Sequence, residues 1–376
     1  MLYMALLMPL LIVCRAVIVL QINKYWKILL ALAVLAAALK YQIVHFFGGG
    51  MFFAPDLPAE ILITANWIYA WELMFFILLA GSETILSVVK IIRKLQKKTL
   101  PADFRHCNNV LNLILLICGG IFAGYLMFAG MRQPEVKELN IVCEKLPAAA
   151  DNLRIVLLAD LHIDRINSGS KIRKIVEKVN VLAPDLIIIA GDVVDGTVKQ
   201  RSDDVKLLGD LRSRYGVYGV PGNHEYFSGY TQWMEFFESI NLKMLKNSHV
   251  KLPCGIYLAG VTDHAAKRRN LPMPDVAKAV QGIDRHEFVL LASHRPSEAI
   301  KASALGIDLQ FSGHTHGGMI RGFDLIVARF NDYLVSGLYR INGLQLYVSN
   351  GTLIWNGFPF RLGRSSEITL ITLKKQ

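Results

Sequence analysis

The sequence is poor in cysteine, and none of its cysteines has the spacing of a metal-binding motif. Five cysteines occur among 376 residues, and no two of them form a Cys-x-x-Cys pair. A structural zinc site built on thiolate ligands is therefore not expected. Cys143 and Cys254 are the two that could form a disulfide, provided that their domain lies outside the cytoplasm.

Charged residues are also scarce, since Asp, Glu, Lys and Arg make up 19% of the chain. Hydrophobic residues make up 53%, and the mean hydropathy is +0.37. Both values exceed those of ordinary soluble proteins and indicate that some segments lie in lipid. The net charge is +11, which suits a polyanion partner or basic loops at a membrane surface. No motif for RNA or DNA is visible, so nucleic acid is not an expected partner.

The first third of the chain contains long apolar runs with few charges. Each run reaches the roughly 20 residues that a helix needs to cross a bilayer. A cleavable signal peptide fits poorly, because residues 1–14 have no basic region at their start. The sequence therefore predicts an all-α bundle of four transmembrane helices within residues 1–131. The four runs are residues 2–20, 26–47, 61–89 and 110–131.

Loop charges predict how this bundle is oriented. The segment between the second and third runs, residues 48–60, has no Lys or Arg. The loop after the third run is basic. Because basic loops stay in the cytoplasm, the domain after residue 131 is predicted to be extracytoplasmic. The basic residues of that loop are Lys90, Arg93, Lys94, Lys97, Lys98 and Arg105.

The second half of the chain alternates between buried strands and amphipathic helices. Continuous apolar runs of four to six residues are typical of strands that are buried on both faces. Asn342-Gly343, between alternating residues, is a type I′ hairpin signal. This pattern predicts an α/β domain with a mixed sheet or two packed sheets. Predicted strands are 153–158, 185–190, 217–220, 288–292, 309–311 and 368–373, and predicted helices are 171–181, 202–214 and 233–240.

Polar residues follow nearly every predicted strand. Because ligands bind beyond the carboxyl ends of strands in open α/β sheets, these residues are expected to converge. Each motif alone is weak, since Asp-x-His can be a surface pair and Gly-Asn-His-Glu a tight turn. Their regular order after successive strands favours one shared site. The residues are Asp160, His162, Asp192, Asp195, Asn223, His224, His294, His314 and His316.

These side chains offer carboxylates, imidazoles and one amide, but no thiolate. Such a set suits Mn, Fe or Zn, and it holds more ligands than one ion needs. Two divalent ions about 3.5–4 Å apart can clamp a phosphoryl group and activate a water molecule. A carboxylate is needed between them, because two dications at that distance repel each other.

The motifs resemble those of the calcineurin-like metallophosphoesterase superfamily, and within it the bacterial membrane-anchored branch. They are Asp160-x-His162, Gly191-Asp192-x-x-Asp195, Gly222-Asn223-His224-Glu225, His294 and Gly313-His314-x-His316. The resemblance implies a four-layer α/β/β/α sandwich of two packed sheets. It covers about residues 135–376 and does not cover the four spans. Together, the spans and the resemblance predict a linker and first strand in residues 132–150 and the metallophosphoesterase domain in residues 151–376, in a multi-pass protein of the bacterial cell membrane.

The resemblance also implies a role for each residue. Asp160, His162 and His316 would hold one divalent ion, and Asn223, His294 and His314 a second. Asp192 would bridge the two ions. His224 would protonate the leaving oxygen, with Asp195 orienting it, and a hydroxide between the ions would attack the phosphorus.

Several arginines lie near these motifs and could steer a phosphate. Arg295, which directly follows His294, is the strongest candidate for substrate binding, and the others are Arg165, Arg321, Arg361 and Arg364. The segment 320–330 is unusually apolar for a loop beside a metal site. It is expected to be either a buried element or a lipid-facing flap.

The leading hypothesis is metal-dependent hydrolysis of a phosphodiester, phosphomonoester or pyrophosphate on a membrane-associated or lipid-linked substrate. The alternative is a catalytically silent metal-binding sensor coupled to the membrane helices. Loss of a ligand would indicate the alternative, and every expected ligand position is filled.

Overall fold

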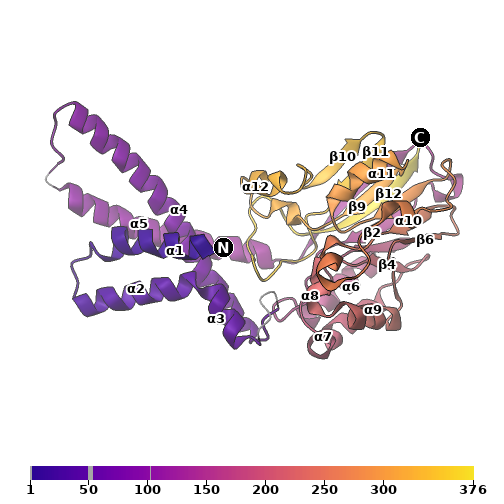
Figure 1. Ribbon diagram of the computed structural model, residues 1–376, viewed down its shortest axis with the longest axis horizontal. Coiled ribbons are helices and arrows are strands. Elements are labelled where there is room, and N and C mark those ends of the chain that lie inside the picture. Colours follow the sequence, from indigo (N-terminus) through magenta and orange to yellow (C-terminus); the bar gives the residue numbers. More distant parts are fainter. Residues whose placement is uncertain (1, 50–53, 102) are drawn as a thin grey trace. The chain divides into compact units, whose positions relative to one another are not determined.

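The chain divides into two compact units, which span Met1–Phe128 and Ala129–Gln376. The computed structural model describes residues 2–49, 54–101 and 103–376, and Figure 1 shows its elements. The first is called the membrane unit below, after the spans predicted for it, and the second the phosphoesterase unit, after the family that its motifs resemble. Residues 50–53, in the segment that lacks Lys and Arg, lie outside the described residues.

The membrane unit is helical. Two of its helices are long and apolar enough to cross a bilayer, namely α4 (Ala59–Leu95) and the part of α5 (Phe104–Met131) that covers His106–Met131. A third span results if the pair α2 (Lys24–Ala38) and α3 (Lys40–Phe47) is counted as one. Among the described residues, two or three helices thus fit a span, whereas the sequence predicted four.

The structure differs from the prediction at the first two predicted spans. The first run forms only a short helix, α1 (Leu2–Ile12), which contains Pro9 and continues as a π-helix over Val13–Val17. The second run is bent by 70° between α2 and α3. The bend falls beside Lys40, whose ammonium donates a hydrogen bond to Asn66 Oδ1 at 2.5 Å. A buried cation with a polar partner here interrupts the apolar run.

The phosphoesterase unit contains two six-stranded mixed sheets. The first has the order β1-β12-β2-β3-β4-β5, and the second has the order β10-β11-β9-β8-β7-β6. Strands β2 to β5 are parallel to one another, as are β7, β8, β9 and β11. The strands of the first sheet are β1 (Glu135–Cys143), β2 (Arg154–Leu158), β3 (Leu186–Ala190), β4 (Val217–Val220), β5 (Leu242–Met244) and β12 (Glu367–Lys375). Those of the second are β6 (Ser248–Lys251), β7 (Tyr257–Gly260), β8 (Val289–Ala292), β9 (Leu309–Ser312), β10 (Gly337–Ile341) and β11 (Leu344–Val348).

The two sheets pack face to face. Ile188 of β3 and Leu290 of β8 belong to one buried apolar cluster, which contains residues of both sheets. A second cluster joins the outer face of the first sheet to α6 and α9. A third joins the outer face of the second sheet to α10 and α11. The layers therefore run helix, sheet, sheet, helix, which confirms the prediction of two packed sheets.

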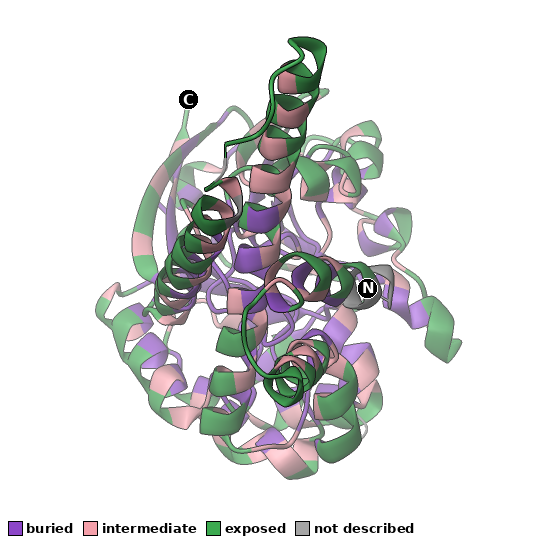
Figure 2. Ribbon diagram, turned by 90° about the vertical axis from the view of Figure 1, so that its left-hand side faces the viewer, coloured by how far each residue is buried: buried purple, intermediate pink, exposed green. Residues whose placement is uncertain are grey.

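Figure 2 shows this burial pattern, with purple residues concentrated in the strands. Asn342 and Gly343 both have positive φ, at 48° and 91°, between antiparallel β10 and β11. The predicted type I′ hairpin is thus confirmed. The helices of this unit are α6 (Gly169–Val181), α7 (Val198–Val205), α8 (Asn223–Ser228), α9 (Tyr230–Ser239), α10 (Val276–Ala279), α11 (Ala299–Ala304) and α12 (Asp324–Arg329).

Candidate metal centre

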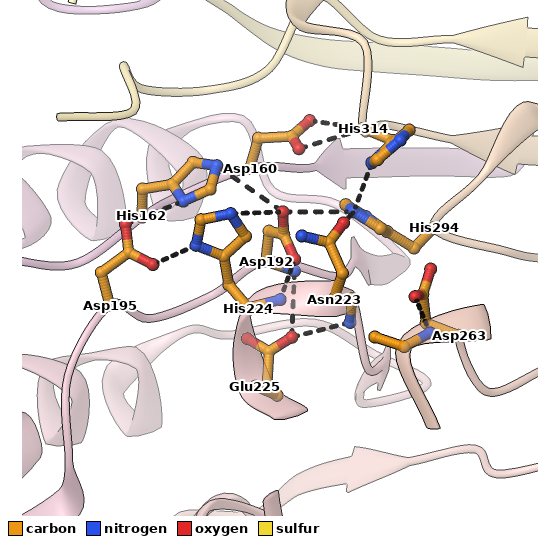
Figure 3. Close-up of polar contacts among 12 residues, drawn as sticks. Asp160, His162, Asp192, Asp195, Asn223, His224, Glu225, Asp263, His294 and His314 are labelled. Carbon is orange, nitrogen blue, oxygen red and sulfur yellow. Dashed lines mark hydrogen bonds and ion pairs between the residues drawn. The ribbon is translucent and has the colours of Figure 1, made fainter. Parts of the chain in front are cut away.

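The predicted ligands lie at the carboxyl ends of strands from both sheets. Because β2, β3 and β4 are parallel, as are β8 and β9, their carboxyl ends meet at one edge of the sandwich. Figure 3 shows the side chains turned toward a common centre. Asp160, His162, Asp192, Asp195, Asn223 and His224 follow strands of the first sheet, and His294, His314 and His316 follow strands of the second.

Five of these residues have a left-handed backbone conformation. The φ angles are 53° for Asp160, 40° for His162, 51° for Asp192, 73° for His314 and 49° for His316. Such conformations cost residues other than glycine on the order of 1–3 kcal/mol each, and they cluster at functional sites. The surrounding fold must therefore hold the turns in place. One of the bonds that does so runs from the His162 N–H to the Asp192 carbonyl, at 3.0 Å.

One group of ligand atoms comes from Asp160, His162 and His316, all within 4.8 Å of one another. The two imidazole Nε2 atoms face each other at 3.0 Å, and Asp160 Oδ1 lies 3.6 Å from His316 Nε2. His162 Nδ1 contacts Asp195 Oδ2 at 3.1 Å. A carboxylate on the far ring nitrogen fixes the tautomer, so that the lone pair of His162 Nε2 points into the group.

A second group comes from Asp192, His294 and His314, again within 4.8 Å. His294 Nε2 lies 3.2 Å from Asp192 Oδ2, from Asn223 Oδ1 and from His314 Nδ1. The other ring nitrogen of His294 contacts the Ala190 carbonyl at 2.8 Å. This bond fixes the orientation of the ring, with Nε2 facing the group. Burial lowers the pKa of His294, but Asp192 outweighs it and raises the pKa to about 10, so metal binding must displace a proton from Nε2.

Asp192 lies between the two groups. Its Oδ2 atom is 3.2 Å from His294 Nε2, 3.7 Å from His162 Nε2 and 3.8 Å from His224 Nε2. The side chain is buried. A single carboxylate oxygen is thus within reach of ligands from both sheets, as a bridging ligand requires.

His224 lies beside the two groups at the start of α8. Its Nδ1 makes a short hydrogen bond with Asp195 Oδ1, and its backbone N–H donates to Asp192 Oδ1 at 2.8 Å. The rings of Phe227 and Trp355 stand edge-on to it, at 5.9 and 5.8 Å between centroids. The imidazole is thereby fixed in position between a carboxylate and two aromatic rings.

Burial and neighbouring charges set the proton states of the site. Burial lowers the pKa of His224, but Asp195 and Asp192 outweigh it and raise the pKa to about 9. Burial raises the pKa of Asp192, but His294 and His224 outweigh it and hold that pKa well below its usual range. Burial, followed by nearby histidines, holds the pKa of His314 far below its usual range. Asp192 is thus ionised and His314 neutral, which are the forms that bind metal.

Comparisons with known proteins agree with this arrangement. Residues 153–318 match the family model described as calcineurin-like phosphoesterase. A metallophosphoesterase of Helicobacter pylori strain J99 is 35% identical over 279 residues, which cover 73% of this chain and 73% of that protein. The chain belongs to the calcineurin-like phosphoesterase family. The resemblance seen in the motifs is confirmed, and the chain is a phosphoesterase of the metal-dependent kind.

Relatives of this phosphoesterase are not confined to bacteria. A zebrafish (Danio rerio) protein named as a transmembrane protein with a metallophosphoesterase domain is 32% identical over 316 residues. The match covers 81% of this chain and 71% of that protein. Together with the apolar helices, this relative supports membrane association. The carboxylate and imidazole donors, with the asparagine amide beside them, fit a divalent cation.

Glu225 is a site residue to which the sequence analysis gave no role. Its buried carboxylate accepts hydrogen bonds from the backbone N–H groups of Gly222 and Val193, both at 2.7 Å. Longer bonds come from the N–H groups of Asp192 at 3.2 Å and Val194 at 3.3 Å. Glu225 thereby ties the turn that carries Asp192 to the turn that carries Asn223. Its place in the Gly-Asn-His-Glu motif was the available signal.

Replacing Glu225 with glutamine is expected to lower the free energy of unfolding by about 2–4 kcal/mol, because an amide keeps one acceptor oxygen but sets an NH2 group against backbone N–H groups that now lack an acceptor. Metal affinity is expected to fall about 10–100-fold, as for other residues that orient ligands. Thermal unfolding and Mn titration of the full chain measure both. Glu235→Gln, on the exposed side of α9, is the matched control. An unchanged metal affinity in Glu225→Gln would contradict a positioning role.

Arg361 does not face a phosphate site. Its buried guanidinium donates to the carbonyls of His316 at 3.2 Å, Asn350 at 2.8 Å and Leu353 at 3.1 Å. Burial lowers its pKa to about 10, so it stays charged at neutral pH. The expectation that Arg361 steers substrate is therefore wrong. Its cation fixes the loop of His316 by satisfying carbonyls that would otherwise be buried unpaired.

Replacing Arg361 with methionine is expected to destabilise the fold by about 3 kcal/mol or more, because several buried carbonyls lose their donor. Differential scanning calorimetry of the full chain measures this loss. Arg321→Met removes an exposed arginine two residues after Met319 and serves as the control. Equal melting temperatures for the two variants would show that the guanidinium contacts add nothing.

Arg295 lies beside the metal groups and is partly exposed. It pairs with Asp263 at 2.7 Å, and its Nη1 is 3.0 Å from His314 Nε2. Arg364 instead pairs with Asp324, at 2.8 Å. In the described part of the chain, Cys143 and Cys254 are both buried and free, so the disulfide that was considered for them is not formed.

Proposed function

We propose that this chain hydrolyses phosphoester bonds with two divalent metal ions, most suitably Mn, Fe or Zn. The observation that carries the proposal is the position of Asp192 Oδ2, within 3.2 Å of His294 and 3.7 Å of His162. Two ligand groups that share one carboxylate are the arrangement that a pair of ions needs.

Each ligand has a place in this proposal. Asp160, His162 and His316 would hold the first ion, and Asn223, His294 and His314 would hold the second. Asp192 would serve both. When bound, the ions would neutralise charge on the phosphoryl group and lower the pKa of a water molecule so that it can attack phosphorus. The facing nitrogen pairs at 3.0 and 3.2 Å support these groupings, because a cation between them satisfies both lone pairs.

His224 is proposed as the general acid for the leaving oxygen, with Asp195 as its orienting partner. Its hydrogen bond to Asp195 uses Nδ1, which leaves Nε2 to face the centre. The pKa of about 9 keeps the imidazole protonated at neutral pH, which is the form that can donate. Bound cations would lower that pKa toward neutrality, where a proton donor is most effective.

The proposed substrate is a phosphodiester, phosphomonoester or pyrophosphate that is membrane-associated or lipid-linked. Arg295 is the proposed contact for its phosphate, because its partly exposed guanidinium adjoins His314. The ion pair with Asp263 holds the guanidinium group of Arg295 in one orientation, which favours bidentate recognition of phosphate. The family supports a phosphate ester as substrate, and the apolar helices support the membrane-borne class.

We further propose a multi-pass protein of the bacterial cell membrane with an extracytoplasmic phosphoesterase unit. The argument depends only on α5 and on the basic loop before it, because a cytoplasmic loop followed by one span places the next domain outside. The same orientation follows whether the membrane unit has two, three or four spans. The proposed divisions are residues 1–131 for the membrane helices, 132–150 for the linker and first strand, and 151–376 for the catalytic domain.

Metal removal tests this proposal. A chelator is expected to abolish phosphoester hydrolysis by the full chain and to lower its melting temperature, and Mn is expected to restore both. A ligand present at about 100 to 1,000 times its dissociation constant stabilises the fold by about 3–4 kcal/mol. Hydrolysis that survives complete removal of metal would contradict the proposal.

A further inference from the structure

An exposed apolar surface lies next to the metal centre, on the segment that connects His316 to β10. It is called the α12 patch below. The short helix α12 (Asp324–Arg329) has no buried residue, so the expectation of a buried element here is wrong. Figure 1 shows α12 at the rim of the phosphoesterase unit, outside both sheets. The patch consists of Phe323, Leu325, Ile326, Phe330 and Tyr333, with Leu325 75% and Phe330 81% exposed.

The base of the patch is fixed to the ligand loop. Gly318, two residues after His316, lies against Asp324 so closely that a Cβ on Gly318 would come within 2.4 Å of the Asp324 Cβ. Asp324 pairs with Arg364 at 2.8 Å, and the Arg321 N–H donates to the Leu362 carbonyl at 2.9 Å. The outward apolar face thus stands on a rigid base. Large apolar side chains that are exposed to solvent on a fixed element indicate an interaction surface.

Charges around the patch complement an anionic surface. Arg321 and Arg329 are exposed on this segment, and its one exposed acid is Asp332. The other acid, Asp324, is neutralised by Arg364. Apolar side chains with basic residues at their edge are typical of elements that lie in the interface of a bilayer with anionic lipid.

A short tether joins the unit that carries this surface to an apolar helix. Helix α5 ends at Met131 and β1 begins at Glu135. The three residues between them can span roughly 14 Å at most, at about 3.6 Å per residue step. A patch on a unit with so short a link to an apolar helix is held at high effective concentration near the bilayer.

We propose that the α12 patch inserts into the interface of an anionic lipid bilayer. A second copy of the chain would cover the apolar side chains equally well, but it would set Arg321 and Arg329 against the same two arginines of the other copy. Insertion would place the rigidly attached His316 loop at headgroup depth. If the proposed function holds, the site then acts on phosphate esters presented in the bilayer surface.

The test uses the full chain in vesicles of phosphatidylcholine with or without phosphatidylglycerol. Cys14, Cys107 and Cys118 are replaced by alanine, while the buried Cys143 and Cys254 remain. An environment-sensitive fluorophore is attached to Phe330→Cys. The control is Val181→Cys, at the end of α6, because Val181 is 84% exposed and Phe330 81%. If Phe330→Cys fails to fold, Tyr333→Cys takes its place.

Spin-labelled acyl chains are expected to quench the probe at 330, more strongly with phosphatidylglycerol, and to leave the probe at 181 unchanged. Aqueous iodide is expected to quench the probe at 181 and to leave the probe at 330 unquenched. Iodide quenching at both positions would overturn the proposal. So would protection of position 330 from iodide without quenching by the labelled lipid, since that result indicates a second copy of the chain.

A second arm measures activity, and only this arm depends on the proposed function. Leu325→Ser with Phe330→Ser is expected to lower kcat/KM about tenfold on a vesicle-borne phosphate ester, through the lost apolar contact. Hydrolysis of soluble bis-p-nitrophenyl phosphate is expected to stay the same. Lipid quenching without any hydrolysis would contradict the proposed function but not the insertion. If the double variant kept full activity on the vesicle-borne ester as well as on the soluble one, insertion of the patch would play no part in hydrolysis.

Discussion

Replacing His224 with alanine is expected to slow hydrolysis of an alkyl phosphate ester by about 10²–10⁴-fold, the usual contribution of a positioned general acid. An alkoxide leaves poorly without a proton, whereas p-nitrophenolate is a weak base that leaves unaided. The same variant should therefore lose much less activity on p-nitrophenyl phosphate. Steady-state kinetics on both esters, with the full chain and saturating Mn, measure the difference.

The control for this prediction is His264→Ala. His264 pairs with Glu298 at 2.7 Å and belongs to none of the ligand groups, and its loss should leave both rates unchanged. Equal losses on the alkyl and p-nitrophenyl esters in His224→Ala would contradict a proton donor. That result would instead fit a residue that positions the ligand Asp192 through its backbone N–H.

Replacing Asp192 with asparagine should cost more than any other single change in the ligand groups. The residues that merely orient ligands typically contribute 10–100-fold, and a carboxylate shared by two ions should exceed that range, so a loss of at least about 10³-fold is expected. Its negative charge also offsets the repulsion between the ions. Metal analysis should then find fewer than two ions per chain, and hydrolysis should fall accordingly.

Asp203→Asn is a suitable control, because that side chain is 90% exposed and pairs with the neighbouring Lys206. It should retain both ions and full activity. Two tightly bound ions in Asp192→Asn, with hydrolysis intact, would show that Asp192 does not bridge. The two groups of ligand atoms would then have to act independently.

The parts of the fold that the sequence predicted well are the buried strands. Runs such as residues 185–190 are apolar throughout, and the strand found there is Leu186–Ala190, buried along its whole length. A strand that is buried on both faces must be continuous in apolar residues, so the sequence records it directly. The strand-end motifs are readable for the same reason, since the polar residues begin where burial by the layers ends.

Short strands and strands at a sheet edge show no such apolar run in the sequence. Strands β5 (Leu242–Met244) and β6 (Ser248–Lys251) were not predicted, because three or four residues are too few to show a period. The predicted helix 202–214 is also wrong in its second half. Helix α7 ends at Val205 and a 3₁₀-helix follows over Lys206–Asp210, as the chain turns toward β4.

The contacts that hold the site depend on tertiary structure. Nothing in the sequence around Arg361 shows that its guanidinium meets the carbonyl of His316, which lies 45 residues earlier. Hydropathy likewise predicts a span over residues 26–47 but does not register its 70° bend beside Lys40, because it averages over a window. Both features involve a partner that is distant in sequence, which for Lys40 is Asn66.

The central claim is that the chain is a two-metal phosphoesterase, and metal titration of hydrolysis tests it most directly. The full chain, stripped of metal and held in detergent, is titrated with Mn while bis-p-nitrophenyl phosphate and p-nitrophenyl phosphate are assayed. The account predicts that hydrolysis rises as two ions bind per chain, and the ratio of the two rates assigns diester or monoester preference. A folded chain that binds two ions and cleaves neither ester, nor a vesicle-borne phosphate ester, would contradict the account and leave a metal-binding sensor.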